Sequence, residues 1–317
     1  MNTQMLMLII SFVATTILGF IIVPKLKKLK IEQVERLDGP KSHLSKGGTP
    51  VMGGIIMIIV VTVLLAIKAI TYHILLLPII AILGFGIIGF IDDYKKLVKK
   101  DTKGLSPILK MTGLFIISTI FIIFYLKVFN LGTDIIVPFL DQPIALSIGA
   151  FVVFTYFILL GTSNAVNLTD GLDGLASGVT AIIMTFFTAV SLKNGNAEMA
   201  IVGVATVGTC LGFLLFNYKP AKVFMGDTGS LALGGAIASI AIILKMPLYL
   251  AIVAIVCVVD TLSSALQVVY FKLTKGKRIF KMAPFHHHLE LCGIKEITVV
   301  WIFWSVTVIA CLIAYFI

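Results

Sequence analysis

The sequence predicts an all-α polytopic membrane protein with about ten transmembrane helices and with both termini outside the cytoplasm. Three observations support this fold class. The 317 residues are 59% hydrophobic and only 13% charged, whereas soluble domains average about 25% charged residues. Apolar runs of membrane-spanning length recur along the chain, and basic residues concentrate in alternate loops. No long hydrophilic stretch separates the runs, so we expect one integral-membrane domain over residues 1–317.

Ten apolar runs are candidate spans, because a helix needs about 20 apolar residues to cross the hydrocarbon core. They cover residues 4–24, 51–68, 74–91, 107–129, 144–163, 174–192, 199–216, 230–246, 248–271 and 297–317. The first run lacks the basic start and the small-residue cleavage site of a signal peptide, so we interpret it as a span. Pro78 and Pro247 lie near the starts of their runs, where a helix tolerates proline.

The loops between these runs alternate in basic content. Segments 25–48, 93–110, 217–229 and 272–296 hold 21 of the 25 Lys and Arg residues, whereas the intervening loops hold one, Lys193. Basic loops stay on the cytoplasmic side of a membrane, so we expect both termini outside. The net charge of +10 is therefore a charge of the cytoplasmic face, where it attracts anionic lipid headgroups and anionic substrates.

Acidic residues recur at the cytoplasmic ends of the predicted spans, although the chain has only 15 of them. Asp92 and Asp93 follow the apolar run 74–91 directly. Carboxylates at the ends of spans are costly to desolvate, which makes them candidates for an active site on the cytoplasmic face. Two adjacent carboxylates there need a metal ion, a proton, or the ammonium of Lys95 or Lys96 beside them. The alternative is a solvated pair in a loop.

Two glycine-rich motifs carry further acids. In NLTDGLDG, residues 167–174, the glycines permit close approach of the backbone to a ligand, and the alternative is a turn in which Asp173 caps a helix. In FMGDTGS, residues 224–230, Asp227 lies between two glycines. Carboxylate, hydroxyl and backbone oxygens of this kind bind magnesium together with substrate phosphates. The alternative is a plain turn in which Ser230 caps the next span.

The motif MAPFHHHLE, residues 282–290, contains three consecutive histidines. Neighbouring residues of a helix point about 100° apart, so His286, His287 and His288 cannot all bind one metal ion. They suit hydrogen bonding to phosphate, and the alternative is a solvated polar loop. The motif DGPKSHLSKGGTPVMGG, residues 38–54, places Lys46 and several glycines before a span. It suits phosphate binding, with a plain turn as the alternative.

In this order the motifs resemble those of the phospho-N-acetylmuramoyl-pentapeptide transferase family, a branch of the polyprenyl-phosphate N-acetylhexosamine-1-phosphate transferase superfamily. The resemblance extends over nearly the whole chain, through DGPKSH, GTPVMGG, GFIDDYKK, NAVNLTDGLDGLA, PAKVFMGDTGSLALG, TLSSALQV and MAPFHHHLE. The aspartate motifs are typical of the superfamily, and the histidine run is typical of the muramoyl-pentapeptide branch. The family's ten-span topology agrees with the pattern of basic loops.

The resemblance implies an Mg²⁺-dependent enzyme of the bacterial cytoplasmic membrane. Such an enzyme transfers phospho-N-acetylmuramoyl-pentapeptide from UDP-N-acetylmuramoyl-pentapeptide to undecaprenyl phosphate, which forms lipid I and UMP in peptidoglycan biosynthesis. The resemblance also implies a homodimer in the lipid bilayer and no nucleic-acid partner.

The resemblance further implies roles for individual residues. The implied catalytic residues are Asp92, Asp93, Asp227 and His286. Asp227 would be the main magnesium ligand. The implied substrate-binding residues are Lys46, Lys96, Asn167, Asp170, Gly171, Leu172, Asp173, Asn217, Phe224, Gln267, His287 and His288. Among these, Lys96 would contact phosphate, and residues 170–173 would lie on the uridine side of the site.

The chain departs from the family pattern at two positions. Val51 replaces the second threonine of GTPTMGG, which removes a hydroxyl near the nucleoside. Leu114 replaces a glutamine that the family often carries four residues after its basic position, here Lys110. We therefore expect the segment around Leu114 to serve packing alone.

Two other functions compete with this one. A sibling enzyme would transfer GlcNAc-1-phosphate to a polyprenyl phosphate, and the triple histidine argues against it. A cation-coupled transporter would need acids near the middle of spans, where only Asp260 lies.

The implied reaction gives a general base little to do. The attacking oxygen belongs to a phosphate monoester, whose second pKa is near ~6, so it is largely ionised at neutral pH. Positioning and the offsetting of phosphate charge should dominate. We therefore predict that Asp92 and Asp93 orient magnesium, a lysine or the lipid phosphate rather than accept a proton.

Overall fold

The computed structural model describes residues 3–29, 48–97, 104–140 and 142–317, and it is almost entirely helical. The main helices are α1 (Thr3–Lys28), α2 (Gly54–Ala69), α3 (Leu76–Leu97), α4 (Pro107–Ile123), α5 (Ile148–Thr169), α6 (Leu175–Lys193), α7 (Ala197–Asn217), α8 (Gly226–Ile243), α9 (Leu250–Val253), α10 (Ile255–Leu273), α11 (Phe285–Leu291) and α12 (Glu296–Phe316). Short 3₁₀ turns η2 (His73–Leu75) and η4 (Pro247–Tyr249) precede α3 and α9, and a π-helical turn η3 (Phe124–Val128) follows α4.

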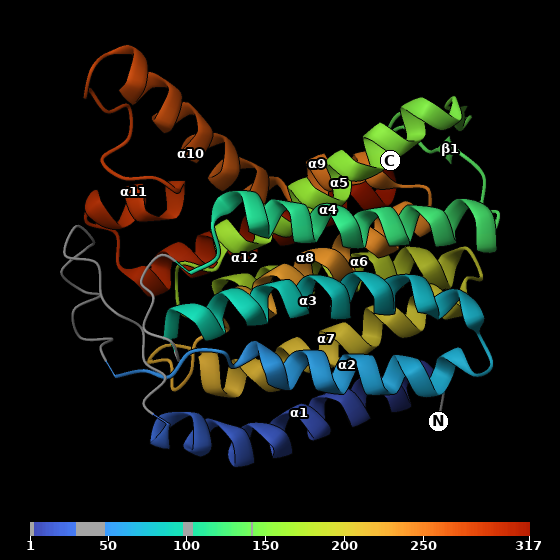
Figure 1. Cartoon of the computed structure of the whole chain (residues 1–317), viewed down its shortest axis with the longest axis horizontal. Coiled ribbons are helices and arrows are strands. Elements are labelled where there is room, and N and C mark those ends of the chain that lie inside the picture. The colour runs from blue at the N-terminus through green and yellow to red at the C-terminus, as the bar shows by residue number, and fades with distance from the viewer. Residues whose placement is uncertain (1–2, 30–47, 98–103, 141) are drawn as a thin grey trace.

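The predicted all-helical polytopic membrane fold is confirmed. Within the described ranges, nine helices are long and apolar enough to cross a membrane, and α2 is a shorter apolar helix. The only sheet there is an antiparallel pair of two-residue strands, β1 (Asp134–Ile135) and β2 (Ile144–Ala145). The start of α1 and the end of α12 lie toward the same end of the helices (Figure 1).

One predicted span, 248–271, is not a single helix. The chain turns at η4 and α9 and then breaks at Ala254, where φ is −104° and ψ is 26°. α10 starts immediately afterwards and leans away from the other helices (Figure 1). The apolar run concealed this break, because hydropathy alone does not distinguish a straight helix from two helices joined at an angle.

α8 lies at the centre of the bundle and packs against α2, α3 and α5. Small residues at these crossings let the backbones approach closely, which is the usual basis of helix association in membranes. A methyl group on Gly54 of α2 would collide with the backbone of Gly229 in α8, and one on Gly89 of α3 would collide with the carbonyl of Asp227. The glycines therefore hold the start of α8 against α2 and α3.

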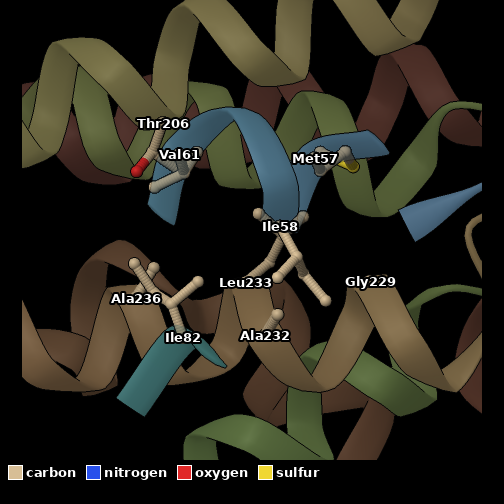
Figure 2. A pocket seen from close by; sticks show the side chains of 9 residues that line it. All are labelled: Met57, Ile58, Val61, Ile82, Thr206, Gly229, Ala232, Leu233 and Ala236. Atoms are coloured by element: carbon tan, nitrogen blue, oxygen red, sulfur yellow. The ribbon is translucent and has the colours of Figure 1, made fainter. Parts of the chain in front are cut away.

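A small apolar cavity lies between α2, α3, α7 and α8 (Figure 2). Its lining residues are Met57, Ile58, Val61, Ile82, Thr206, Gly229, Ala232, Leu233 and Ala236. Only Thr206 among them carries a hydroxyl, and that group donates a hydrogen bond of 2.8 Å to the carbonyl of Val202 in its own helix. The cavity is thus a feature of helix packing and offers no free polar group to a charged substrate.

Candidate active site

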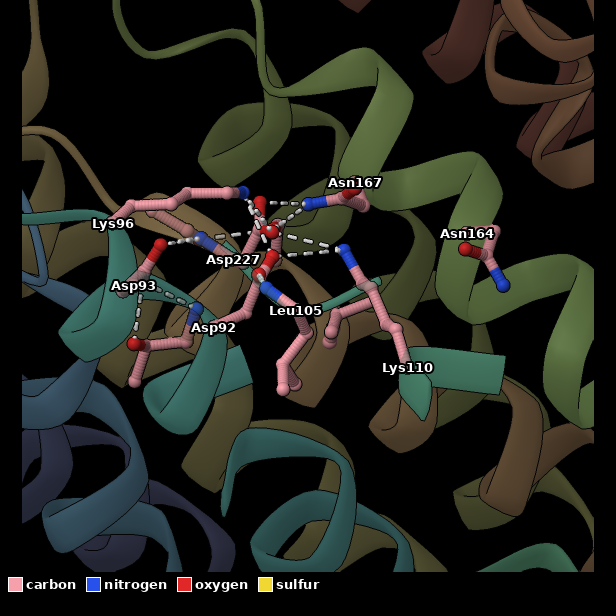
Figure 3. A network of polar contacts seen from close by, with 12 residues as sticks. Asp92, Asp93, Lys96, Leu105, Lys110, Asn164, Asn167 and Asp227 are labelled. Atoms are coloured by element: carbon pink, nitrogen blue, oxygen red, sulfur yellow. Dashed lines mark hydrogen bonds and ion pairs between the residues drawn. The ribbon is translucent and has the colours of Figure 1, made fainter. Parts of the chain in front are cut away.

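The candidate active site is centred on three carboxylates that α3 and α8 bring together (Figure 3). Asp92 and Asp93 lie within α3, which continues to Leu97 instead of ending with the apolar run, and both are buried, with 2% and 4% of their surface exposed. Asp227 lies in the first turn of α8. The structure thus brings the three acids together, and the alternative of a solvated pair for Asp92 and Asp93 is wrong.

Two lysines form ion pairs with Asp92 and Asp227 of this cluster. The ammonium of Lys96, one turn after Asp92 in α3, lies 2.7 Å from Asp92 Oδ2 and 3.0 Å from Asp227 Oδ2. The ammonium of Lys110, from the first turns of α4, lies 2.9 Å from Asp227 Oδ2 and 3.7 Å from Asp92 Oδ2. Buried carboxylates require such partners. Figure 3 shows both lysine side chains pointing at the carboxylates, whereas Asn164 points away.

Asp93 has a different environment from Asp92. Its Oδ1 accepts a hydrogen bond of 3.2 Å from the backbone N–H of Asp227, and its Oδ2 accepts from the N–H and the hydroxyl of Thr228 at 2.9 and 2.6 Å. The first N–H groups of a helix have no partner within the helix, and a negative charge there is favourable. Asp93 therefore caps α8 from a neighbouring helix. Asp92 instead faces the lysines and accepts from Leu105 N–H at 2.6 Å.

We predict that Asp92→Asn and Asp93→Asn fail for different reasons. An amide at position 93 turns one acceptor into a donor that faces the start of α8, and a buried unsatisfied polar group costs roughly 1–3 kcal/mol. Asp93→Asn should therefore lower the thermal unfolding temperature as well as the transfer rate. Asp92→Asn should lower the rate with little change in unfolding temperature, because α8 keeps its cap. Thermal unfolding and rate measured on the same preparations check this division, which is wrong if both variants are equally destabilised.

Asn167 fixes the third carboxylate from α5. Its side-chain Nδ2 donates hydrogen bonds of 2.8 Å to Asp227 Oδ1 and to Ser230 Oγ. Ser230 lies in the second turn of α8, where its hydroxyl donates to the carbonyl of Gly226. The alternative in which Ser230 caps this helix is therefore wrong, since α8 begins at Gly226. Asn167 instead restrains the orientation of Asp227.

The residues implied on the uridine side form a second polar network. Asn217, at the end of α7, accepts hydrogen bonds from Gly174 N–H and the Ser177 hydroxyl and donates to the Val223 carbonyl. Asp173 Oδ2 accepts from Ala221 N–H at 3.1 Å. The α6 N-cap is Gly174, without a side-chain cap, so the alternative in which Asp173 caps this helix is wrong. The network joins the 170–174 loop to the segment between α7 and α8.

Glu296, at the first position of α12, completes this network. It is buried, its Oε1 accepts from Asp173 N–H at 3.0 Å, and its Oε2 forms an ion pair with Lys219. No motif in the sequence marks Glu296, although its place directly before the apolar run 297–317 is a usable signal. Phe224 lies half-buried in the same region, and its N–H donates to the Pro50 carbonyl at 2.8 Å.

The three histidines of α11 point to three different partners. His286 is fully buried, and its Nδ1 lies 2.9 Å from Asp260 Oδ2. His287 Nδ1 lies 2.9 Å from Glu290 Oε2. His288 Nδ1 accepts a hydrogen bond of 3.1 Å from the N–H of Lys281. The prediction that one metal ion cannot take all three is thus consistent with this geometry, and the alternative of a solvated loop is wrong for His286.

The remaining predicted residues are placed as follows. The Gln267 amide accepts from the N–H groups of Ile279 and Phe280 and donates to the Phe280 carbonyl, so it binds the loop before α11 to α10. Leu172 and Leu114 are buried, which confirms the packing role expected of Leu114. Asp170 is the C-terminal cap residue of α5, and Gly171 lies against His286. Lys46 lies outside the described residues.

The carboxylates suit a magnesium ion whose coordination shell is completed by substrate. No group of three His, Cys, Asp or Glu side chains in the described ranges is arranged to hold a metal ion by itself. However, Asp92 Oδ2 and Asp227 Oδ2 already share one cationic group, the Lys96 ammonium. Magnesium is usually bound through one or two carboxylates together with substrate phosphates and water. The carboxylate oxygens of Asp227 and Asp92 are of the kind that this ion binds, so the residues present fit it.

Comparisons with known proteins show which family the chain resembles. Residues 74–245 match the family described as Glycosyl transferase family 4. The chain is 50% identical to the phospho-N-acetylmuramoyl-pentapeptide-transferase of Acetivibrio thermocellus over 311 residues. The aligned region covers 97% of this chain and 93% of the relative. It is 48% identical to the proteins of the same name from Clostridium botulinum, over 97% of this chain and 94% of the relative, and from Caldicellulosiruptor bescii, over 98% and 95%.

These matches extend over nearly the full length of both chains. The apolar helices make the chain a multi-pass membrane protein, as the sequence predicted. The chain belongs to the phospho-N-acetylmuramoyl-pentapeptide-transferase family.

Proposed function

We propose that this chain transfers phospho-N-acetylmuramoyl-pentapeptide from UDP-N-acetylmuramoyl-pentapeptide to undecaprenyl phosphate and thereby forms lipid I and UMP. Membership of the family supports the activity. One structural observation carries it: two lysines and three aspartates converge where membrane-spanning helices end. Such a position meets both a lipid that stays in the bilayer and a nucleotide that stays in water. The cluster can exchange its internal ion pairs for contacts to phosphate.

Charge is the main obstacle to this reaction. The lipid phosphate and the two phosphates of the donor are all anionic, and the attacking oxygen is largely ionised without help, because the second pKa of a phosphate monoester is near ~6. Catalysis then consists of positioning and electrostatic stabilisation. Lys96 and Lys110 suit this task, since each has an ammonium group within 3.0 Å of Asp227 that can turn to a phosphate oxygen.

The three carboxylates have separate roles in offsetting the phosphate charge. Asp227 and Asp92 would hold Mg²⁺, which supplies positive charge beside the phosphates when it is bound. Asn167 restrains Asp227, and Asp93 holds the first turn of α8 in place. No proton acceptor is needed among them, in line with the role predicted from the sequence. The 170–174 loop, tied to Asn217, would receive the uridine.

We also propose the orientation and assembly. The basic segments face the cytoplasm and both termini lie outside. This topology is supported by the start of α1 and the end of α12, which lie toward the same end of the helices (Figure 1). Residues 1–317 act as one transferase domain in the bacterial cytoplasmic membrane, as a homodimer. Accessibility of single introduced cysteines to a membrane-impermeant reagent tests the orientation.

The decisive experiment compares donors. Purified protein in vesicles that contain undecaprenyl phosphate receives either UDP-N-acetylmuramoyl-pentapeptide or UDP-GlcNAc, with and without Mg²⁺. We expect UMP release and a lipid-linked product with the muramoyl donor alone, and only with Mg²⁺. Product from UDP-GlcNAc instead would assign the chain to the sibling activity. Solute uptake without UMP release would make it a transporter.

A further inference from the structure

A second buried acid–base pair lies outside the carboxylate–lysine cluster. Asp260 of α10 and His286 of α11 are both fully buried. Asp260 Oδ1 accepts a hydrogen bond of 3.2 Å from the backbone N–H of His286, while Oδ2 lies 2.9 Å from the ring Nδ1. One carboxylate thus holds both the backbone and the ring of one histidine. These two hydrogen bonds fix the orientation of the imidazole ring, which apolar packing alone would not do.

The pair determines which ring nitrogen is available. A carboxylate only accepts hydrogen bonds, so Nδ1 carries the hydrogen and Nε2 is the atom left for another partner. Nε2 is buried and has no hydrogen-bond partner among the residues that the structure describes. An unsatisfied buried polar atom costs roughly 1–3 kcal/mol, and native proteins rarely retain one without a functional reason.

The free nitrogen faces the loop that follows α5. A methyl group on Gly171 would collide with His286 Nε2 and lie 2.9 Å from Cε1, so only a glycine fits there. One helical turn earlier in the same chain segment, Asn167 binds Asp227. The end of α5 therefore touches the carboxylate–lysine cluster with one residue and the free nitrogen of His286 with another.

We infer that Asp260 is a positioning residue of the transferase: it fixes the His286 ring so that Nε2 points to the Gly171 side of the site and can form a hydrogen bond to substrate. This inference rests on the proposed function. Asp260 touches neither substrate nor metal and acts only through His286.

The test uses the full-length protein in vesicles and three variants. Asp260→Asn keeps the size of the side chain but cannot accept from both His286 donors, and Asp260→Glu keeps the carboxylate. Ser263→Ala is the matched control, because Ser263 is buried in the same helix and its hydroxyl only donates to the Asp260 carbonyl. The quantities measured are kcat, KM for the UDP donor and the thermal unfolding temperature.

We expect Asp260→Asn to lower kcat roughly tenfold to hundredfold, the usual effect of removing the carboxylate behind a functional histidine, with KM changed less than about threefold. Asp260→Glu should stay within about tenfold of the wild-type kcat, and Ser263→Ala should match the wild type. If Asp260→Asn does not fold, Asp260→Ser replaces it under the same criterion, since its hydroxyl still accepts one hydrogen bond.

Three results would overturn the inference: a kcat for Asp260→Asn within about threefold of the wild type, a loss confined to KM, or equal losses in the Asn and Glu variants. These results differ from a failure of the proposed function. If the proposed function fails, the wild-type protein itself releases no UMP from the muramoyl donor.

Discussion

Replacing Asp227 by asparagine lowers the rate of UMP release roughly 10³-fold, the effect expected when a group that organises transition-state charge is removed. Asparagine keeps the shape of the side chain, so the hydrogen bond to Asn167 can persist. It removes the charge that binds Lys96 and Lys110 and would bind Mg²⁺. Initial rates of UMP release at saturating donor and lipid, measured over a range of Mg²⁺ concentrations, check this result.

The matched control is Asp134→Asn. Asp134, on β1, forms an ion pair of 2.8 Å with Lys245, which follows α8. Both side chains are partly exposed and lie away from the cluster. Exposed pairs contribute only about 0–1 kcal/mol, so this variant should keep the wild-type rate. A second measurement is independent of activity: Mg²⁺ should raise the unfolding temperature of the wild type and of Asp134→Asn, but not that of Asp227→Asn. Equal stabilisation of all three would exclude Asp227 as a metal ligand.

Replacing Gly89 by alanine should lower the transfer rate on the order of 10²-fold and destabilise the protein. The added methyl group would collide with the Asp227 carbonyl oxygen and lie 2.7 Å from Thr228 N. These are backbone atoms, which cannot rotate aside, so α3 and the start of α8 must separate. Overpacking of this kind costs about 1–3 kcal/mol. A displacement of about 1 Å within a catalytic site costs on the order of 10²-fold in rate.

Gly161→Ala is the control for this prediction. Gly161 is also a glycine within a membrane-spanning helix, α5, but a methyl group there meets no atom within 4 Å beyond its own helix and chain neighbours. It should leave the rate and the unfolding temperature unchanged. Thermal unfolding in detergent and rate measurement on both variants decide the matter. A fully active Gly89→Ala protein would show that the contact between α3 and α8 is not needed for catalysis.

The structure corrects the sequence analysis mainly where local patterns were ambiguous. Ser230 and Asp173 are typical capping residues, yet their side chains contact other segments of the chain. The N-cap of α6 is Gly174, and α8 already begins at Gly226. The break at Ala254 was hidden in an apolar run. The structural positions of Glu296 and Asp260 were missed because a single acid at the edge of a span, or within one, has no recognisable motif around it.

The sequence by itself determined the membrane fold and the positions of most spans, and its motifs pointed to Asp92, Asp227 and His286 as candidates. Hydropathy, loop charge and short motifs are local properties, so they can be read without coordinates. Only the tertiary structure decided which groups meet. Asp227 is joined to Asn167, Lys110 and Lys96 across 60, 117 and 131 residues of chain. Those contacts depend on how closely α3, α4, α5 and α8 approach one another. The size of the side chains at the crossings sets that distance, and no local pattern in the sequence encodes it.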